Sequence, residues 1–214
     1  AFMLLGNMID RKMFEAVSQF DLVSGRGTTA DVVVNKVTKE TVAIIKQFDF
    51  DNKRKTQSVI IRDENTKKMF IYTKGTGEAL KAICQPASIP AMFDEAVAQS
   101  AKTGIYQLSI GFREVSSSEE EGLMTRSRDE IESRLNFLGF INFTNSMKKD
   151  TPEVIRQLKE GAIRTVMISG DHILTAIYMS RLSGMIHADS RLLLGSSISD
   201  KGEIAFLDEA TGQD

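Results

Sequence analysis

The clearest chemical signal in the sequence is a short acidic turn, Ser169-Gly170-Asp171, between an apolar run at residues 163–168 and a helical pattern at residues 173–183. A strand that ends in such a turn places a carboxylate at the carboxyl end of a parallel sheet, where α/β proteins keep their chemistry. Ser169 and Gly170 let the backbone approach an oxyanion, and Asp171 can hold Mg²⁺. The turn is a candidate phosphate site, and the alternative is an Asp-capped helix after a tight turn.

The elements that must position this turn follow from the periodicity of apolar residues. Residues 8–20 carry a helical stripe that includes Asp10, and Gly104 would end the helix at 90–103. Further helices are expected at 77–83, 152–160 and 173–183. Alternating β-branched and aromatic residues predict strands at 31–37, 41–48, 58–63, 68–73, 107–114 and 134–143, then at 163–168, 192–194 and 203–207, with a turn at 200–202.

These patterns predict an α+β fold of two parts. An antiparallel sheet flanked by helices is expected over residues 1–143, a hinge at 144–147, and a partial α/β unit over 148–214. Residues 116–122 combine serine and charge without apolar residues, which indicates a solvent loop, with modification of its serines as the alternative. A partial second sheet would expose a strand edge, so residues from 148 onward are expected to be less ordered or to self-associate.

Composition excludes several classes of protein. The chain has 214 residues, of which 42% are hydrophobic and 26% charged, as in an ordinary soluble globular protein. A net charge of −2 gives no reason to expect nucleic acid as a partner, and no apolar run reaches the length of a membrane span. The single cysteine, Cys84, has no partner for an internal disulfide. His172 and His187 have no further ligand at metal-binding spacing, so no metal site is expected.

Five segments in a fixed order carry a family resemblance. They are Phe48-Asp-Phe50-Asp-Asn-Lys-Arg-Lys55-Thr-Gln-Ser58-Val59, Lys74-Gly75-Thr-Gly-Glu78, Gly104-Ile-Tyr106-Gln-Leu108, Leu135-Asn-Phe-Leu-Gly139 with Lys148-Lys-Asp150-Thr151, and Val166-Met-Ile-Ser-Gly-Asp171 with Thr175-Ala176. Their motifs and order resemble the cytosolic part of P-type ATPases. The amino-acid sequence of residues 167–186 resembles the fifth class of P-type ATPases, a cation-transporting group.

The resemblance implies that residues 1–143 are a nucleotide-binding domain and that the rest belongs to a haloacid-dehalogenase-like phosphorylation domain. The parent would be an integral membrane protein with this part on the cytosolic face, ATP or ADP as ligand, and Mg²⁺ bound together with the intact phosphorylation domain. The family's Asp-Lys-Thr-Gly nucleophile motif and its Gly-Asp-Gly motif are absent here. The chain is therefore expected to be a fragment that delivers ATP to an aspartate outside it, and that is inactive alone.

The same resemblance assigns roles at the nucleotide. Phe50 would stack on adenine, with a core phenylalanine as the alternative. Lys74 would reach phosphate as a flexible point charge while Gly75 keeps the backbone clear of the ligand. Lys55 would be a second cation, with Lys53 and Arg54 as alternates in a basic triplet that otherwise forms a solvated turn.

Three positions depart from the family pattern. Asp10 stands where the family has a helical glutamate near the adenine amino group, and its side chain is shorter by one methylene. Tyr106 stands where the family has a phosphate-binding arginine, so we expect weaker phosphate affinity. His172 replaces an asparagine after Asp171, while Ser169, Gly170 and Asp171 would still support the phosphoryl group.

Two alternatives stay open at this point. A haloacid-dehalogenase-like phosphatase with a large cap would also contain the Ser-Gly-Asp turn, although it would need a nucleophile motif that the sequence lacks. A non-catalytic interaction module could keep the nucleotide-domain fold without binding ATP, and the departures at Asp10 and Tyr106 favour that reading.

Overall fold

The computed structural model describes residues 7–23, 31–144, 146–187 and 189–211. These residues form two compact units. The first runs up to Val97 and includes Gln107–Asn142, and the second combines Ala98–Tyr106 with the chain from Phe143 onward. The expected hinge at 144–147 falls near this division, and one of its residues, Asn145, lies outside the described residues.

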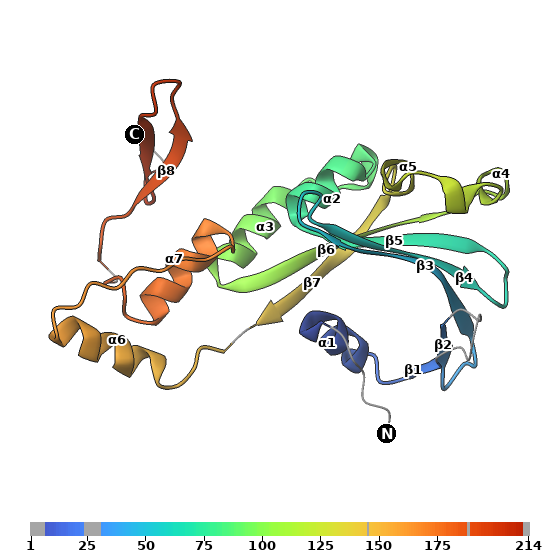
Figure 1. Ribbon diagram of the computed structural model, residues 1–214, viewed down its shortest axis with the longest axis horizontal. Helices are drawn as coiled ribbons and strands as arrows, with labels where there is room; N and C mark the ends of the chain where they lie inside the picture. The colour runs from blue at the N-terminus through green and yellow to red at the C-terminus, as the bar shows by residue number, and fades with distance from the viewer. Residues whose placement is uncertain (1–6, 24–30, 145, 188, 212–214) are drawn as a thin grey trace. The chain divides into compact units, whose positions relative to one another are not determined.

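A seven-stranded sheet organises the first unit, with its strands in chain order (Figure 1). Each pair from the first strand to the sixth is antiparallel. The strands are β1 (Phe20–Val23), β2 (Val32–Asn35), β3 (Thr41–Asp51), β4 (Thr56–Asp63), β5 (Met69–Gly75), β6 (Ile105–Glu114) and β7 (Asn136–Thr144). The expected α+β class with an antiparallel sheet is confirmed, and β1 is a strand that the periodicity did not predict.

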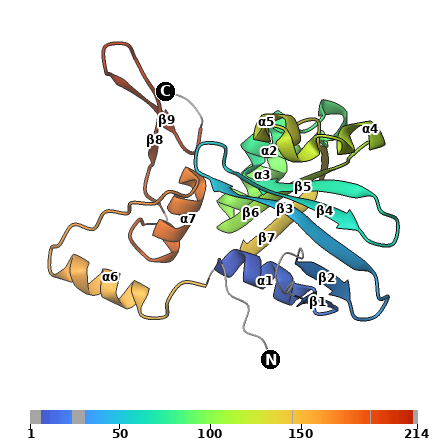
Figure 2. The same cartoon turned by 45° about the vertical axis from the view of Figure 1, so that its right-hand side comes forward.

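Side chains alternate between the two faces of this sheet. On β4, Thr56, Ser58 and Ile60 are buried while Gln57 and Val59 are half-buried, as a period of two requires. The buried face packs against α2 (Gly77–Ile83) and α5 (Arg128–Ile131), and α1 (Met8–Ala16) lies on the opposite, open face (Figure 1, Figure 2). The core between sheet and helices consists of Ile60, Ile71, Leu80, Cys84, Val115, Leu123, Ile131 and Leu135.

Shorter elements complete the first unit. They are η1 (Pro86–Ser88), the start of α3 (Phe93–Lys102), α4 (Ser117–Glu120) and η2 (Leu123–Thr125). The prediction of an unstructured loop at 116–122 is wrong because Ser116 and Glu119 form a capping box that starts α4.

The second unit contains α6 (Thr151–Glu160), α7 (Ile173–Leu182) and a hairpin of β8 (Leu193–Ile198) with β9 (Ile204–Asp208). The expected helices and the two short strands are confirmed, and Gly202 takes a left-handed conformation at φ 80° in the turn between those strands. In the described part of the chain, no helix is long and apolar enough to cross a membrane.

The predicted strand at residues 163–168 is not formed. This segment has no regular structure, and Ile168 is 94% exposed. A strand requires a partner backbone, and the described strands of the second unit pair only with each other. The described residues of the second unit thus lack the strand that the expected haloacid-dehalogenase-like unit would place there, and the apolar run alone was insufficient evidence for a buried strand.

Candidate functional site

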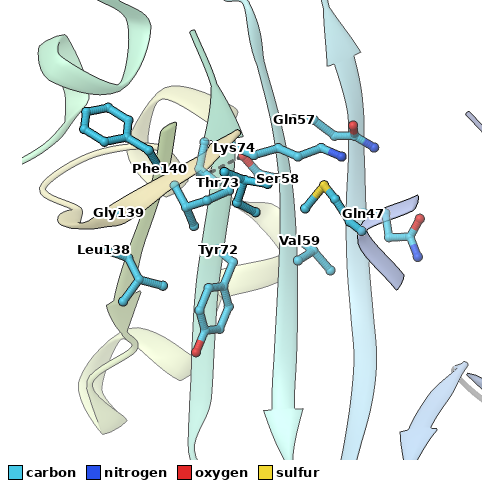
Figure 3. Close-up of a pocket in the computed structure, with 13 residues that line it drawn as sticks. Gln47, Gln57, Ser58, Val59, Tyr72, Thr73, Lys74, Leu138, Gly139 and Phe140 are labelled. Carbon is cyan, nitrogen blue, oxygen red and sulfur yellow. Dashed lines mark hydrogen bonds between the residues drawn. The ribbon is translucent and has the colours of Figure 1, made fainter. Parts of the chain in front are cut away.

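The open face of the sheet in the first unit carries a cavity of about 560 Å³ (Figure 3). Its walls come from α1, β3, the first half of β4, the last half of β5, the middle of β6, and β7. The lining residues are Met13, Gln47, Gln57, Ser58, Val59, Tyr72, Thr73, Lys74, Ile110, Leu138, Gly139, Phe140 and Ile141. Most of this wall is apolar, and among its residues Lys74 alone carries a charge.

Strand register explains which side chains meet here. Gln57 on β4 is paired with Lys74 on β5, which is paired with Ile110 on β6, so the three form one row across the sheet. The neighbouring row joins Val59 to Tyr72. Because cross-strand neighbours share a face, both rows point to the open side, and Tyr72 lies next to the lysine row.

Lys74 is held at the cavity wall by an ion pair with Asp10 of α1. Its side chain is 18% exposed, and burial lowers the pKa of its ammonium group. The carboxylate of Asp10 opposes that shift because it favours the charged form. The contact joins residues that are 64 positions apart in the sequence, so the structure brings together two of the predicted site residues.

Glycine is required at position 75 because other parts of this chain leave no room for a side chain. A Cβ atom at this position would lie 2.4 Å from the carbonyl oxygen of Lys55 and 2.7 Å from Leu80 Cδ2. The glycine therefore lets the β3–β4 turn pass close to the end of β5. This packing gives Gly75 a structural role that does not depend on a ligand.

The predicted adenine platform, Phe50, does not line the cavity, and it is 52% exposed. The register shift between Phe48 and Asp51 nevertheless sets Asp49 and Phe50 opposite Gln57, at the outer end of the lysine row. The structure therefore does not bring the Phe50 side chain into the cavity wall.

The basic residues Lys53, Arg54 and Lys55 form a turn, and their side chains lie in different environments. The side chain of Asp51 accepts the backbone N–H groups of Lys53 and Arg54, at 2.7 and 3.0 Å. Arg54 forms an ion pair with Asp129 on the helix-covered side of the sheet. Lys55 has a left-handed backbone at φ 56°, is exposed and does not line the cavity. The structure therefore brings none of these cations to the cavity wall.

Among the wall residues only Lys74 was predicted from the sequence, and those missed include Tyr72, Phe140 and Gln57. Tyr72 stands two residues before Lys74 on the same strand, so the period of two would have placed both on one face. Phe140 packs against Phe93 with ring centroids 5.1 Å apart, a contact between distant segments that no local pattern reveals.

The remaining predicted residues belong to the second unit. Ser169 Oγ donates to Asp171 Oδ2 at 3.1 Å and accepts the Asp171 backbone N–H at 3.1 Å, while His172 Nδ1 caps α7 by accepting the N–H of Leu174. Gly170 lies in an open turn where a Cβ would meet nothing within 4 Å. Tyr106 is half-exposed, and its pKa is raised by burial and then by the charge of Asp171.

No metal-binding cluster appears in the part of the chain that the structure describes. Nowhere in it do three or more His, Cys, Asp or Glu side chains meet. Asp171 and Ser169 offer oxygen atoms to a cation only as a pair. Any Mg²⁺ at this chain would need most of its ligands from a nucleotide, from water or from another part of a protein.

Comparison with known proteins agrees with this architecture. Residues 6–150 match the family model described as "P-type ATPase, cytoplasmic domain N". Because this match covers more than half of the chain, the protein belongs to the P-type ATPase family, and its antiparallel sheet with the flanking helices is the N domain of that family.

Several relatives belong to the fifth class of these ATPases. The chain is 32% identical over 166 residues to the human "Polyamine-transporting ATPase 13A3", a match that covers 77% of this chain and 14% of the relative. It is 30% identical over 201 residues to the human "Probable cation-transporting ATPase 13A4", covering 88% and 17%. It is 34% identical over 145 residues to the "Vacuolar cation-transporting ATPase YPK9" of Saccharomyces cerevisiae, covering 68% and 10%. The chain thus spans less than a fifth of the length of these relatives.

Proposed function

We propose that the first unit binds ATP or ADP in the cavity on the open face of its sheet. The observation that carries this proposal is the position of Lys74, a half-buried cation at the wall of a cavity of about 560 Å³. That volume falls within the roughly 300–1,000 Å³ typical of small-molecule sites, which combine apolar walls with a few placed polar groups.

Each part of a nucleotide has a matching surface here. The apolar wall around Val59, Tyr72 and Phe140 suits a base, and an aromatic ring can stack on it. Phe50 at the outer end of the lysine row would cover the exposed edge of that base. Lys74 would contact the phosphates, and it must leave Asp10 in part to do so.

In this role the N domain presents the nucleotide to a phosphorylated aspartate that lies outside this chain. Ser169, Gly170 and Asp171 would support the phosphoryl group, and Mg²⁺ would enter with the phosphates of ATP. Transport of a cation or of another substrate would then be the activity of the whole ATPase, whose membrane part would be the partner of this chain.

A second candidate is a nucleotide-domain-like module that binds no nucleotide. The observation in its favour is that Lys74 already has an anionic partner in Asp10, and that neither Lys55 nor Arg54 lines the cavity. The haloacid-dehalogenase-like phosphatase is the weaker alternative, since the nucleophile motif that it needs is absent from the sequence.

Calorimetric titration with ADP and ATP distinguishes the two remaining candidates. We expect dissociation constants between high micromolar and millimolar, roughly 4–6 kcal/mol of binding free energy. Lys74→Ala should weaken binding about tenfold, as expected for loss of a hydrogen-bonded charge. Lys81→Ala is the matched control, because Lys81 is also ion-paired, with Asp94, but lies outside the cavity. Equal affinities in wild type and Lys74→Ala would remove the basis of the proposal.

A further inference from the structure

A second cavity, of about 580 Å³, lies in the first unit where β6 ends and β7 begins. In contrast to the nucleotide site, it is lined only by polar and charged residues. Those that matter here are Arg113, Ser116, Ser118, Glu119 and Arg134. We call it the arginine cavity, and nothing in the proposed nucleotide site uses it.

Arg113 is the unusual member of the arginine cavity. Its side chain extends from β6 and only 6% of the residue is exposed. Its Nη1 donates to Glu119 Oε2 at 3.1 Å, whereas its buried Nε and Nη2 atoms have no hydrogen-bond partner among the described residues. Nε and Nη2 form one edge of the planar guanidinium group, and such an edge binds two oxygens of a carboxylate or phosphate at once. A buried polar edge without a partner calls for one, and a water or an anion would supply it.

The charges around this edge do not balance. Glu119 is approached by three guanidinium groups, from Arg113 at 3.1 Å, Arg126 at 3.2 Å and Arg134 at 3.6 Å. The other acidic lining residue, Glu114, forms an ion pair with Lys68 at 2.8 Å. One carboxylate therefore faces three guanidinium groups, of which Arg126 also lies near Glu130, and a local surplus of positive charge remains.

This surplus and the neighbouring donors fit a dianion better than a single carboxylate. Ser118 Oγ lies 3.1 Å from Ser116 Oγ, which in turn donates to Glu119 Oε2 at 3.0 Å, so exposed hydroxyl groups stand beside the arginines. A phosphoryl group carries close to two negative charges and three strong acceptor oxygens at neutral pH. We propose that the arginine cavity is a phosphoryl-binding site, separate from the nucleotide site.

The phosphoryl group has two chemical sources that would use the same contacts. One is a free phosphate-class anion from solution. The other is Ser118 itself, whose hydroxyl oxygen would take the γ-phosphoryl group of ATP from a protein kinase and lose its proton. In either case the group would contact the exposed guanidinium of Arg134 and the serine hydroxyls, and it would reach the buried free edge of Arg113 only after that side chain rotates toward the cavity.

The test follows the Nε–H signal of Arg113 by nuclear magnetic resonance during titration with inorganic phosphate. We expect a saturable shift at millimolar phosphate. Sodium chloride of equal ionic strength should not produce it, and this control separates phosphate binding from ionic screening. Arg134→Gln should weaken phosphate binding at least about fivefold, because one charged contact is lost. The side chain of Arg134 is 76% exposed, so this variant should fold normally. Arg191→Gln, at a 75% exposed arginine of the second unit, is the matched control.

Two further samples identify the source and separate this proposal from nucleotide binding. Protein with phosphoserine incorporated at position 118 should show the Arg113 shift without added phosphate if the group is esterified to the chain. Lys74→Ala should leave the Arg113 response unchanged, even where nucleotide binding fails. An Arg113 Nε–H signal that responds neither to phosphate nor to phosphoserine at position 118 would overturn the proposal.

Discussion

Lys74 at the end of β5 and Asp10 in α1 form an ion pair across the open face of the sheet. This contact fixes the first helix against the cavity wall and gives the single charged group of that wall an internal counter-ion. A nucleotide that binds through Lys74 must compete with Asp10 for it. Removal of the Lys74 charge should therefore lower the affinity for nucleotide, and removal of the Asp10 charge should raise it.

Asp10→Asn should raise the affinity for ATP by about two- to fivefold, the range expected from exposed ion pairs of up to about 1 kcal/mol. The amide keeps the size of the side chain and removes the charge that competes with phosphate. Calorimetry with ATP and adenosine measures the effect, which should be larger for ATP. A loss of ATP affinity in a folded Asp10→Asn protein would mean that the carboxylate itself contacts the ligand, as the family resemblance suggested.

Gly75→Ala should destabilise the first unit by about 1–3 kcal/mol or more, because the new Cβ would overlap the Lys55 carbonyl and the side chain of Leu80. Urea unfolding followed by circular dichroism measures the change. Gly170→Ala is the control, since nothing lies within 4 Å of a Cβ there. Equal unfolding midpoints for the two variants would show that the close approach at Gly75 relaxes without cost.

Cys84 should resist thiol reagents in the folded protein. Burial raises the pKa of its thiol to about 11. Compared with an ordinary thiol pKa of about 8.5, this lowers the thiolate fraction at pH 8 by about two orders of magnitude. Because the folded chain holds this proton more tightly, the related stabilisation is complete below about pH 8.5 and is lost as the pH rises toward 11.

Kinetics with an aromatic disulfide reagent at pH 8, in native buffer and in urea, test this prediction, and urea unfolding at pH 8 and pH 10.5 tests the stability. Rapid modification of the native protein at pH 8, at the rate seen in urea, would contradict the buried position of Cys84.

The chain alone should form no phosphoenzyme. The family's carboxylate nucleophile has no matching motif in the sequence, and phosphoryl transfer requires that nucleophile. Incubation with γ-labelled ATP and Mg²⁺, followed by acid precipitation, should leave the protein unlabelled. Hydroxylamine-labile label that disappears in Asp171→Asn or Asp150→Asn would show that this chain contains its own acceptor.

Local patterns were sufficient for much of the fold. The helix at residues 77–83 and the strands at the centre of the sheet follow from periodicity and from caps such as Thr76, whose side chain accepts the Ala79 N–H. Residues 163–168 were predicted wrongly because an apolar run has the same composition whether or not a partner strand lies beside it. Pairing is a property of the whole sheet, and a single segment does not encode it.

The candidate site was predictable only in part for the same reason. Lys74 could be found from its motif, and in the structure it lies at a cavity wall. The wall itself depends on strand register and on contacts between distant segments, such as Phe140 with Phe93. The free edge of Arg113 is likewise a result of packing, since an arginine in a strand pattern gives no sign of which partners it will lack.

Mapping amide chemical-shift changes during titration with a non-hydrolysable ATP analogue is the most direct test of the nucleotide site. We expect the largest changes on residues 57–59 and 72–75 and on α1 near Asp10 and Met13, with saturation at high micromolar to millimolar ligand. Lys74→Ala should remove these changes, while Lys81→Ala should keep them. An unchanged spectrum, or changes confined to residues outside the open-face cavity, would contradict the central claim that this N domain binds nucleotide at Lys74.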